Sequence, residues 1–337
     1  MMAEDEIKVS PEISQIIKEI EELKIQGATA VAESSFEGIK LYIEGYDKSD
    51  VHRDVFLADV EKVGLKLVKA RPNEPLARNG LKYLLNTFKI QNPGLNDIDE
   101  MQGKLTGIMD GFLELLKKAK SKIVDVGIKE FSTLNGVLTH CHSSTVENVL
   151  KGIVEKKSKG EWFSILATET RPRYQGRITA KNLTEAGLEV LMIVDSAVTS
   201  FLSGDWKASD ISGDWGDWDI PVDGVFIGCD QINFNGDTIN KVGSYGIALS
   251  AYYSSKPVYV VGTILKMDPS TVYDHPKIEM RDPKEIWEDA PDKLKLINPA
   301  FEIIPREFVT GGFVTEFGVL KPDDLEKALN DNYDWMW

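Results

Sequence analysis

Residues 139–144 read Thr-His-Cys-His-Ser-Ser, directly after a short apolar run and before a predicted helix that begins at about Thr145. A cysteine in that position lies where backbone N–H groups and the helix dipole favour negative charge. We therefore expect a lowered pKa for the Cys141 thiol, which would make it a usable base or nucleophile. The same position suits a phosphate group, with Ser143 beside it. The alternative is that Cys141 is a buried, inert small side chain.

The pattern around Cys141 does not favour a metal. His140 and His142 flank it, but adjacent residues of an extended segment point in opposite directions. A structural zinc site needs more ligands at motif spacing, and Cys229 is the chain's other cysteine. A disulfide between the two cysteines would be uncommon in the cytosol. The histidines fit structural hydrogen bonding better than general-base roles.

Apolar, β-rich runs alternate with helical stretches from residue 136 onward. Near-continuous apolar strands separated by helices predict a parallel sheet covered on both faces, which is a Rossmann-like, doubly wound α/β domain. Ligands of such sheets bind beyond the carboxyl ends of the strands. The predicted strands are Gly136–Leu138, Trp162–Thr168, Val190–Val194, Gly224–Ile227, Val258–Val261 and Phe313–Thr315.

The predicted strand ends carry polar, chemically competent residues. Arg171 and Lys241 suit the oxygens of a phosphate or sugar phosphate. A Cys141 thiolate and a protonated Asp230 would form a base and acid pair, because burial and a nearby like charge both raise the pKa of a carboxyl group. Two groups with separated pKa values can move a proton between adjacent carbons. The residues therefore indicate isomerisation without any cofactor.

Other interpretations of these residues remain open at this stage. Asp195 and Asp230 could cap following helices. Arg171 could pair with Glu169, and a helix is expected from about Thr179, after Gln175 and Gly176.

The first third of the chain has helical periodicity and no convincing strand. Ser10 and Pro11 predict an N-cap and first helical residue, with Gly27 ending or interrupting that helix. Further helical runs are expected near Leu81–Phe88 and along an apolar stripe from Met101 to Ala119. We predict a helical domain over residues 1–127 and the α/β catalytic domain over 128–337.

Composition limits the possible partners. The formal net charge of −15 argues against a nucleic-acid surface, which would show clustered Lys and Arg. No apolar stretch reaches transmembrane length, and the N-terminus lacks the features of a signal peptide, so we expect no membrane contact and a cytoplasmic location. The Trp-rich segment 201–221 is expected to be a packed surface loop, a substrate lid or a subunit contact.

Several motifs in collinear order resemble one superfamily. They are Thr-His-Cys-His-Ser, Glu-Thr-Arg-Pro-x-x-Gln-Gly, Val-Asp-Ser-Ala, Gly-x-Asp-x-Ile and Asn-Gly-Asp-x-x-Asn-Lys-x-Gly, within about residues 131–320. The superfamily includes regulatory subunits of translation initiation factor 2B, methylthioribose-1-phosphate isomerase and archaeal ribose-1,5-bisphosphate isomerase. His142-Ser143 after Cys141, and the stretch from Ile278 to Pro283, are similar to the ribose-bisphosphate group.

The resemblance implies conversion of α-D-ribose 1,5-bisphosphate to ribulose 1,5-bisphosphate in AMP or nucleoside salvage. It implies that Cys141 takes the C2 proton and that Asp230 serves as the acid for the oxygens. It also implies dimers that combine into hexamers, and it brings in AMP as a candidate activator. The substrate-binding residues that it implies are Gln26, Gly27, Ala28, Arg71, His142, Ser143, Arg171, Gln175, Gly176, Asn240 and Lys241.

One departure bears on the substrate. The family usually has Arg-Gly-Ala where this chain has Gln26-Gly27-Ala28, so a cation expected to face a phosphate is missing. A charge-assisted contact contributes about 1.5–3 kcal/mol, enough to shift specificity without abolishing chemistry. Two alternatives therefore stay open: a non-catalytic regulatory subunit that binds a sugar phosphate or nucleotide, and an isomerase for a singly phosphorylated pentose.

Overall fold

A computed structural model describes residues 7–47, 51–158, 161–204 and 221–337. The chain divides into two compact units, which we call the helical unit and the sheet unit. The helical unit comprises Met1–Lys118, Leu265–Pro269 and Leu329–Trp337, and the sheet unit comprises Ala119–Ile264 and Ser270–Ala328. The prediction for the Trp-rich segment falls mostly on residues 205–220, which lie outside the described residues.

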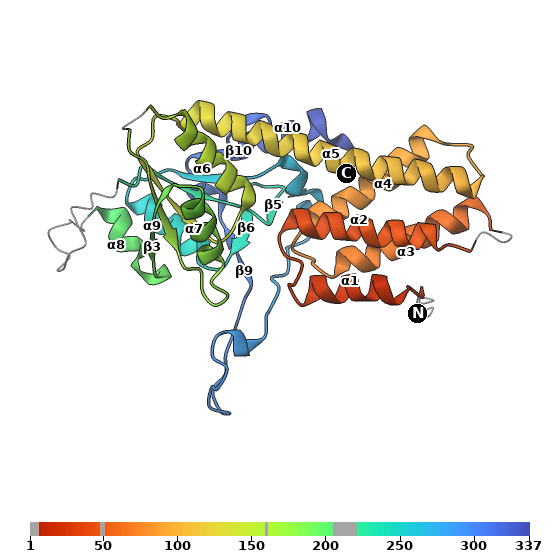
Figure 1. Cartoon of the computed structure of the whole chain (residues 1–337), viewed down its shortest axis with the longest axis horizontal. Helices are drawn as coiled ribbons and strands as arrows, with labels where there is room; N and C mark the ends of the chain where they lie inside the picture. Colours follow the sequence, from red (N-terminus) through yellow and green to blue (C-terminus); the bar gives the residue numbers. More distant parts are fainter. Residues whose placement is uncertain (1–6, 48–50, 159–160, 205–220) are drawn as a thin grey trace. The chain divides into compact units, whose positions relative to one another are not determined.

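The helical unit begins as its sequence predicts. The Ser10 hydroxyl accepts a hydrogen bond from the Ile13 N–H at 3.4 Å, which caps helix α1 (Pro11–Glu21). Gly27 does not end α1, because that helix stops at Glu21; Gly27 is instead the N-cap of α2, with φ of 90°. The helices that follow are α2 (Ala28–Glu44), α3 (Arg53–Lys69), α4 (Pro75–Gln91) and the first part of α5 (Ile98–Phe131) (Figure 1).

Two helical expectations compare differently with the structure. The apolar stripe from Met101 to Ala119 is confirmed, since all of its members on α5 except the partly exposed Ile108 are buried at three- and four-residue spacing. The predicted run Leu81–Phe88 is too short. Helix α4 begins at Pro75, because proline is well placed at a first helical position, where its missing N–H is not needed.

The sheet unit contains a seven-stranded sheet in the order β11-β10-β7-β4-β1-β2-β3. All neighbours pair in parallel except β10 and β11. The predicted α/β fold with a mainly parallel sheet is therefore confirmed. The strands are β1 (Gly136–His140), β2 (Ser164–Thr168), β3 (Glu189–Ile193), β4 (Gly224–Ile227), β7 (Val258–Val261), β10 (Gly312–Thr315) and β11 (Gly318–Leu320).

The strand order reverses beside β1. The chain runs from β1 to β2 and β3 on one side, then returns on β4, which pairs with the other side of β1 in the register His140↔Ile227. In a doubly wound sheet, the crevice for a ligand opens at such a reversal, outside the carboxyl ends of the strands. The residues that follow β1 and β4 therefore occupy the position where a site is expected.

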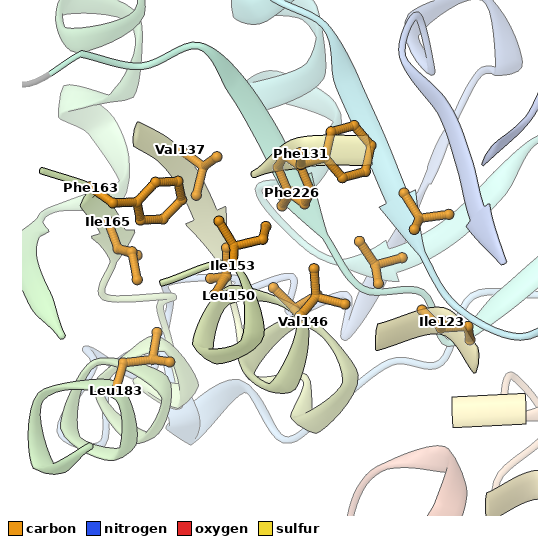
Figure 2. Close-up of a cluster of buried hydrophobic side chains, with 13 residues drawn as sticks. Ile123, Phe131, Val137, Val146, Leu150, Ile153, Phe163, Ile165, Leu183 and Phe226 are labelled. Atoms are coloured by element: carbon orange, nitrogen blue, oxygen red, sulfur yellow. The ribbon is translucent and has the colours of Figure 1, made fainter. Parts of the chain in front are cut away.

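Helices cover both faces of this sheet. On one face, α6 (Ser144–Lys156), α7 (Gln175–Glu185) and the end of α5 enclose a core that includes Val146, Leu183 and Phe226 (Figure 2). Helix α9 (Ser244–Tyr253) connects β6 to β7 and packs against β4 and β7. The connection from β4 to β7 runs along the sheet in the direction opposite to the connections from β1 to β2 and β3. Because such crossovers are right-handed, α9 lies on the face opposite to α6 and α7.

A second, antiparallel set of strands was missed by the sequence reasoning. Its strands within the sheet unit are β5 (Gln231–Asn233), β6 (Thr238–Lys241) and β9 (Phe301–Ile304). The other elements are β8 (Met267–Asp268), α8 (Val198–Ser203) and α10 (Leu325–Asn332). Among the described residues, no helix combines the length and the apolar character needed to cross a membrane.

Candidate functional site

Cys141 lies directly beyond β1 and is held from three directions. Its backbone N–H donates to the Thr170 hydroxyl at 2.9 Å, and its carbonyl accepts from the Thr179 hydroxyl at 3.0 Å. The thiol itself lies 3.7 Å from Oε1 of Gln175, to which it donates. The backbone φ of Cys141 is 68°, in the left-handed region. Residues other than glycine rarely adopt this conformation, and those that do are often found at functional sites.

The expectation of a lowered thiol pKa was wrong. Burial raises the pKa of Cys141 to about 12; Lys241 lowers it, while Asp230 and Asp195 raise it. Helix α6 begins only at Ser144, with Ser143 as its N-cap, and burial outweighs any help that the helix gives to the thiolate. The charges that act on the thiol are therefore those of Lys241, Asp230 and Asp195.

Asp230 and Lys241 reach this place from β4 and β6. The Asp230 N–H donates to the Ile239 carbonyl at 2.9 Å, which ties the residues after β4 to β6. Asp230 therefore precedes a strand rather than capping a helix, so the capping interpretation was wrong. Lys241 is 8% exposed, and its ammonium group lies 4.7 Å from the centre of the Phe301 ring. Asn240 donates to the Ser244 hydroxyl at 2.8 Å.

His140 is a buried, neutral hydrogen-bonding residue. Its Nε2 lies 2.9 Å from the Val242 carbonyl, which can only accept, so Nε2 carries the proton. Its Nδ1 then accepts from the Thr168 hydroxyl at 2.6 Å. Burial lowers the pKa of His140. Gly243, with φ of 107°, leaves room for the ring, since a Cβ there would lie 2.8 Å from Cε1 of His140.

His142 and Ser143 turn toward α6 and α7. Nδ1 of His142 is 2.9 Å from Glu147 Oε1 and 3.1 Å from the Thr179 hydroxyl. Burial by itself would raise the pKa of the Glu147 carboxyl group, but hydrogen bonds with His142 and Asn182 outweigh burial and hold this pKa below its ordinary value. Within the described ranges, no group of three or more His, Cys, Asp or Glu residues is arranged to hold a metal ion.

Gln175 and Gly176 form the first turn of α7, so this helix begins earlier than the predicted Thr179. Gly176 is required sterically, because a Cβ there would lie 1.8 Å from the Thr168 carbonyl oxygen. Only glycine lets α7 start this close to β2. The close approach places Gln175 against the Cys141 thiol.

Asp195 holds the backbone that leads to Arg171. Its two carboxylate oxygens accept from the N–H groups of Thr170 at 2.8 Å and Arg171 at 2.6 Å, so it does not cap a helix. The Arg171 guanidinium donates to the Tyr174 hydroxyl and to the Ile286 carbonyl, the latter at 2.9 Å. The suggested pair with Glu169 is wrong, because Glu169 pairs with Arg177 at 3.1 Å.

A cavity of about 300 Å³ opens beside these residues. It does not reach Cys141 or Asp230, but its wall includes Val242, which follows Lys241 and binds His140. The cavity therefore lies beside the partner of His140, and the thiol does not line it. Its lining includes Arg171, Pro172, Asp195, Val242, Gly243, Ile286 and Asn298.

Four of the predicted binding residues belong to the helical unit. Gln26 and Gly27 are exposed just before α2, and Ala28 is its buried first residue. Arg71 is 4% exposed and pairs with Glu74 at 2.8 Å. The other predicted residues, Cys141, His142, Ser143, Arg171, Gln175, Gly176, Asp230, Asn240 and Lys241, all belong to the sheet unit.

Sequence reasoning missed the residues that hold the Cys141 backbone and the start of α9. Thr170 and Thr179 make backbone contacts with Cys141, and Glu302 accepts from the N–H groups of Gly243 and Tyr245 at the start of α9. Thr170 stands within the Glu-Thr-Arg-Pro motif, so its place beside other motif residues was an available signal. Nothing in the sequence pattern distinguishes Thr179 or Glu302.

The chain combines a doubly wound sheet with a thiol, a carboxylate and an ammonium group on or directly after β1, β4 and β6. Comparison with known proteins identifies its family. Residues 24–322 match the Initiation factor 2 subunit family, to which the chain belongs. A ribose 1,5-bisphosphate isomerase from Thermococcus kodakarensis is 29% identical over 333 residues, covering 97% of this chain and 96% of the relative.

Two other comparisons show the breadth of the family. A methylthioribose-1-phosphate isomerase from Symbiobacterium thermophilum is 28% identical over 91% of this chain and 84% of its own length. The crystal structure of translation initiation factor eIF-2B from Pyrococcus horikoshii superposes with a TM-score of 0.74 at 21% identity, covering 93% of this chain and 98% of that one. The fold is therefore common to proteins named as enzymes and as translation factors.

Proposed function

We propose that this protein is an aldose-ketose isomerase that converts α-D-ribose 1,5-bisphosphate to D-ribulose 1,5-bisphosphate, in AMP or nucleotide salvage in the cytoplasm. What supports the proposal is that Cys141 and Asp230 follow β1 and β4, the strands at the reversal of the sheet, and that the charges of Asp230 and Lys241 both act on the thiol. The names of the relatives support the substrate class.

The proposed reaction moves two protons and needs no cofactor. Cys141, as the thiolate, takes the proton from C2 of the sugar and returns it to C1. Asp230, as the carboxylic acid, protonates the ring oxygen as the ring opens and later accepts the proton of the C2 hydroxyl. The product is an isomer of the substrate, and both side chains end in the state in which they began.

The starting protonation state follows from the thiol's environment. Since burial raises the pKa of Cys141 to about 12, the thiol is neutral at physiological pH. Transfer of its proton to Asp230 would create the required base and acid together. Lys241 favours the thiolate formed in this way, because a cation nearby stabilises the charged form of a thiol.

The proposed substrate contacts use charge and helix termini. Lys241 and Arg171 would bind anionic oxygens, and Ser143 with the N–H groups at the start of α6 would bind a phosphate. Further contacts with the substrate would come from His142, Gln175, Gly176 and Asn240. The contribution of Gln26, Gly27, Ala28 and Arg71 rests on the family motifs alone.

A second candidate function is a regulatory subunit that binds a sugar phosphate or nucleotide without turnover. The likeness to the eIF-2B structure and the Gln26 substitution favour it. Homodimers or hexamers, and activation by AMP, belong to the isomerase proposal. Adding AMP to the turnover assay tests the activation directly.

The decisive experiment is to incubate the protein with ribose 1,5-bisphosphate and follow ribulose 1,5-bisphosphate, with a singly phosphorylated ribose as comparison substrate. Cys141→Ser and Asp230→Asn should each lower turnover by about 10²–10⁴-fold, because each removes a proton-transfer group. Cys229→Ser is the matched control and should retain turnover. Unchanged turnover in either test variant removes that residue from the mechanism, and binding without turnover in the unaltered protein favours the regulatory subunit.

A further inference from the structure

A long loop of the sheet unit, residues 281–298, projects from the rest of that unit; we call it the arm (Figure 1). Its residues Ile286 and Asn298 line the cavity together with Arg171. At its base the Arg281 N–H donates to the Asn298 carbonyl at 2.8 Å, and Met280 forms a bridge with Pro299. Most residues of the arm are exposed, whereas Asn298 is 3% exposed. The arm is therefore anchored to the sheet unit through few side chains.

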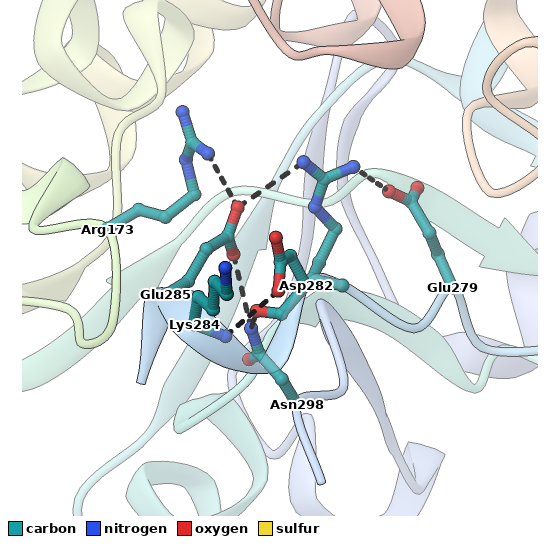
Figure 3. Close-up of polar contacts among 7 residues, drawn as sticks. Arg173, Glu279, Asp282, Lys284, Glu285 and Asn298 are labelled. Carbon is teal, nitrogen blue, oxygen red and sulfur yellow. Dashed lines mark hydrogen bonds and ion pairs between the residues drawn. The ribbon is translucent and has the colours of Figure 1, made fainter. Parts of the chain in front are cut away.

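Glu285 is the side chain on which these anchoring contacts converge (Figure 3). Its Oε1 accepts from Arg173 at 2.7 Å and from Arg281 at 3.3 Å. Its Oε2 accepts from the Asn298 side chain at 3.2 Å. One carboxylate thus joins both ends of the arm to Arg173, which belongs to the turn formed by residues 170–175.

That turn contacts Cys141 at both of its ends. Thr170 accepts from the Cys141 N–H, and Gln175 accepts from the thiol. Thr170 and Tyr174 have φ values of 61° and 57°, a left-handed conformation that the surroundings must hold in place. Arg171 also donates to Ile286, so two arginines of the turn bind neighbouring residues of the arm.

We propose that Glu285 is a positioning residue for Cys141: by binding Arg173 it holds the turn that supplies the thiol with its hydrogen-bond acceptor. Glu285 acts through the turn and does not itself touch the reacting atoms. The inference rests on the proposed isomerase for its consequence in turnover. The reactivity of the thiol, by contrast, can be measured whether or not the protein turns over a sugar phosphate.

The experiment measures alkylation of Cys141 by iodoacetamide across pH, with the Cys141 and Cys229 peptides separated by mass spectrometry. Besides burial, the groups that shift the pKa of the thiol are Lys241, Asp230 and Asp195, together with a backbone hydrogen bond from His142. In Glu285→Gln the pair with Arg173 loses its charge, so the turn loosens and water reaches the sulfur. At about pH 8 each unit of fall in the thiol pKa raises the alkylation rate about tenfold.

Three further variants serve as controls. Glu279→Gln alters the other carboxylate of Arg281, at 3.2 Å and on the far side of that arginine from Glu285, and should alkylate as the unaltered protein does (Figure 3). Arg173→Ala should reproduce Glu285→Gln. Arg173→Lys, which keeps the charge, should recover part of the slow rate.

The proposal is overturned by an unchanged pH profile of Cys141 in Glu285→Gln, or by an equal change in Glu279→Gln. If Cys229 also becomes reactive, the variant has lost its fold, and Arg173→Ala then decides. A selective rise at Cys141 in that variant supports the proposal, and no rise overturns it. If the unaltered protein shows no isomerase turnover, the proposed function fails while this comparison still stands. If it does turn over, Glu285→Gln should lower kcat more than it alters KM.

Discussion

The sequence predicts which reactive side chains belong to the candidate site, but it does not predict the direction in which their pKa values shift. Cys141, Asp230 and Lys241 stood out because reactive residues at successive strand ends converge in a doubly wound sheet. The direction of the thiol's pKa shift was not predictable. It depends on burial beside Thr170 and Gln175, which come from another segment of the chain, and spacing along the sequence carries no measure of that burial.

Lys241→Met should make the Cys141 thiol harder to ionise. A thiol is charged only when deprotonated, so the Lys241 cation lowers the pKa of Cys141, which burial raises to about 12. Removing that cation should therefore raise the pKa of the thiol further. Alkylation of Cys141 should therefore slow at every pH below that value, while turnover of ribose 1,5-bisphosphate falls by about 10–100-fold through the lost charge-assisted contact. Lys241→Arg is the control that keeps the charge. Faster alkylation in Lys241→Met would contradict the assignment.

At the scale of strands and helices, the sequence predicts the buried parallel strands but not the short strands β5 and β6. Apolar, β-rich runs identified the buried parallel strands, because both of their faces lie against helices. Strands β5 and β6 escaped, since Gln231–Asn233 and Thr238–Lys241 mix polar with apolar residues and yet are fully buried. Two of their polar side chains, Asn240 and Lys241, belong to the candidate site.

Gly176→Ala should destabilise the start of α7. The added Cβ would meet the Thr168 carbonyl at 1.8 Å, and neither backbone can yield cheaply. Overpacking of this kind costs about 1–3 kcal/mol or more, and it would move Gln175 away from the thiol. Urea denaturation gives the stability change, and alkylation of Cys141 reports the displacement of Gln175.

The matched control is Gly246→Ala, near the start of α9, where nothing lies within 4 Å of the added Cβ. There alanine should stabilise the helix by about 0.5–1 kcal/mol, because glycine is entropically unfavourable in a helix. Equal effects of the two substitutions would show that the contact with Thr168 is not rigid.

For the molecule as a whole, the sequence predicted the fold class and the family, but it did not predict the contacts of the arm. The motifs occur in collinear order along the α/β part, so they identified the superfamily that the comparison over residues 24–322 confirms. The arm has little regular structure beyond one short helical turn at Pro283–Glu285. Neither hydrophobic periodicity nor residue spacing can therefore reveal that Glu285 joins it to Arg173.

The whole-molecule prediction is self-association into dimers or hexamers. Strand β3 is an edge of the seven-stranded sheet, and Met192 on it and Val194 just after it are 42% and 52% exposed. Exposed apolar residues on an edge strand are usually covered by another element or another chain. Sedimentation equilibrium should therefore give two or six times the mass of one chain. An apolar contact should also persist at about 0.5 M salt, where exposed charges are screened. The mass of a single chain over the whole concentration range would contradict the prediction, and dissociation by salt alone would point to a contact made by charges instead.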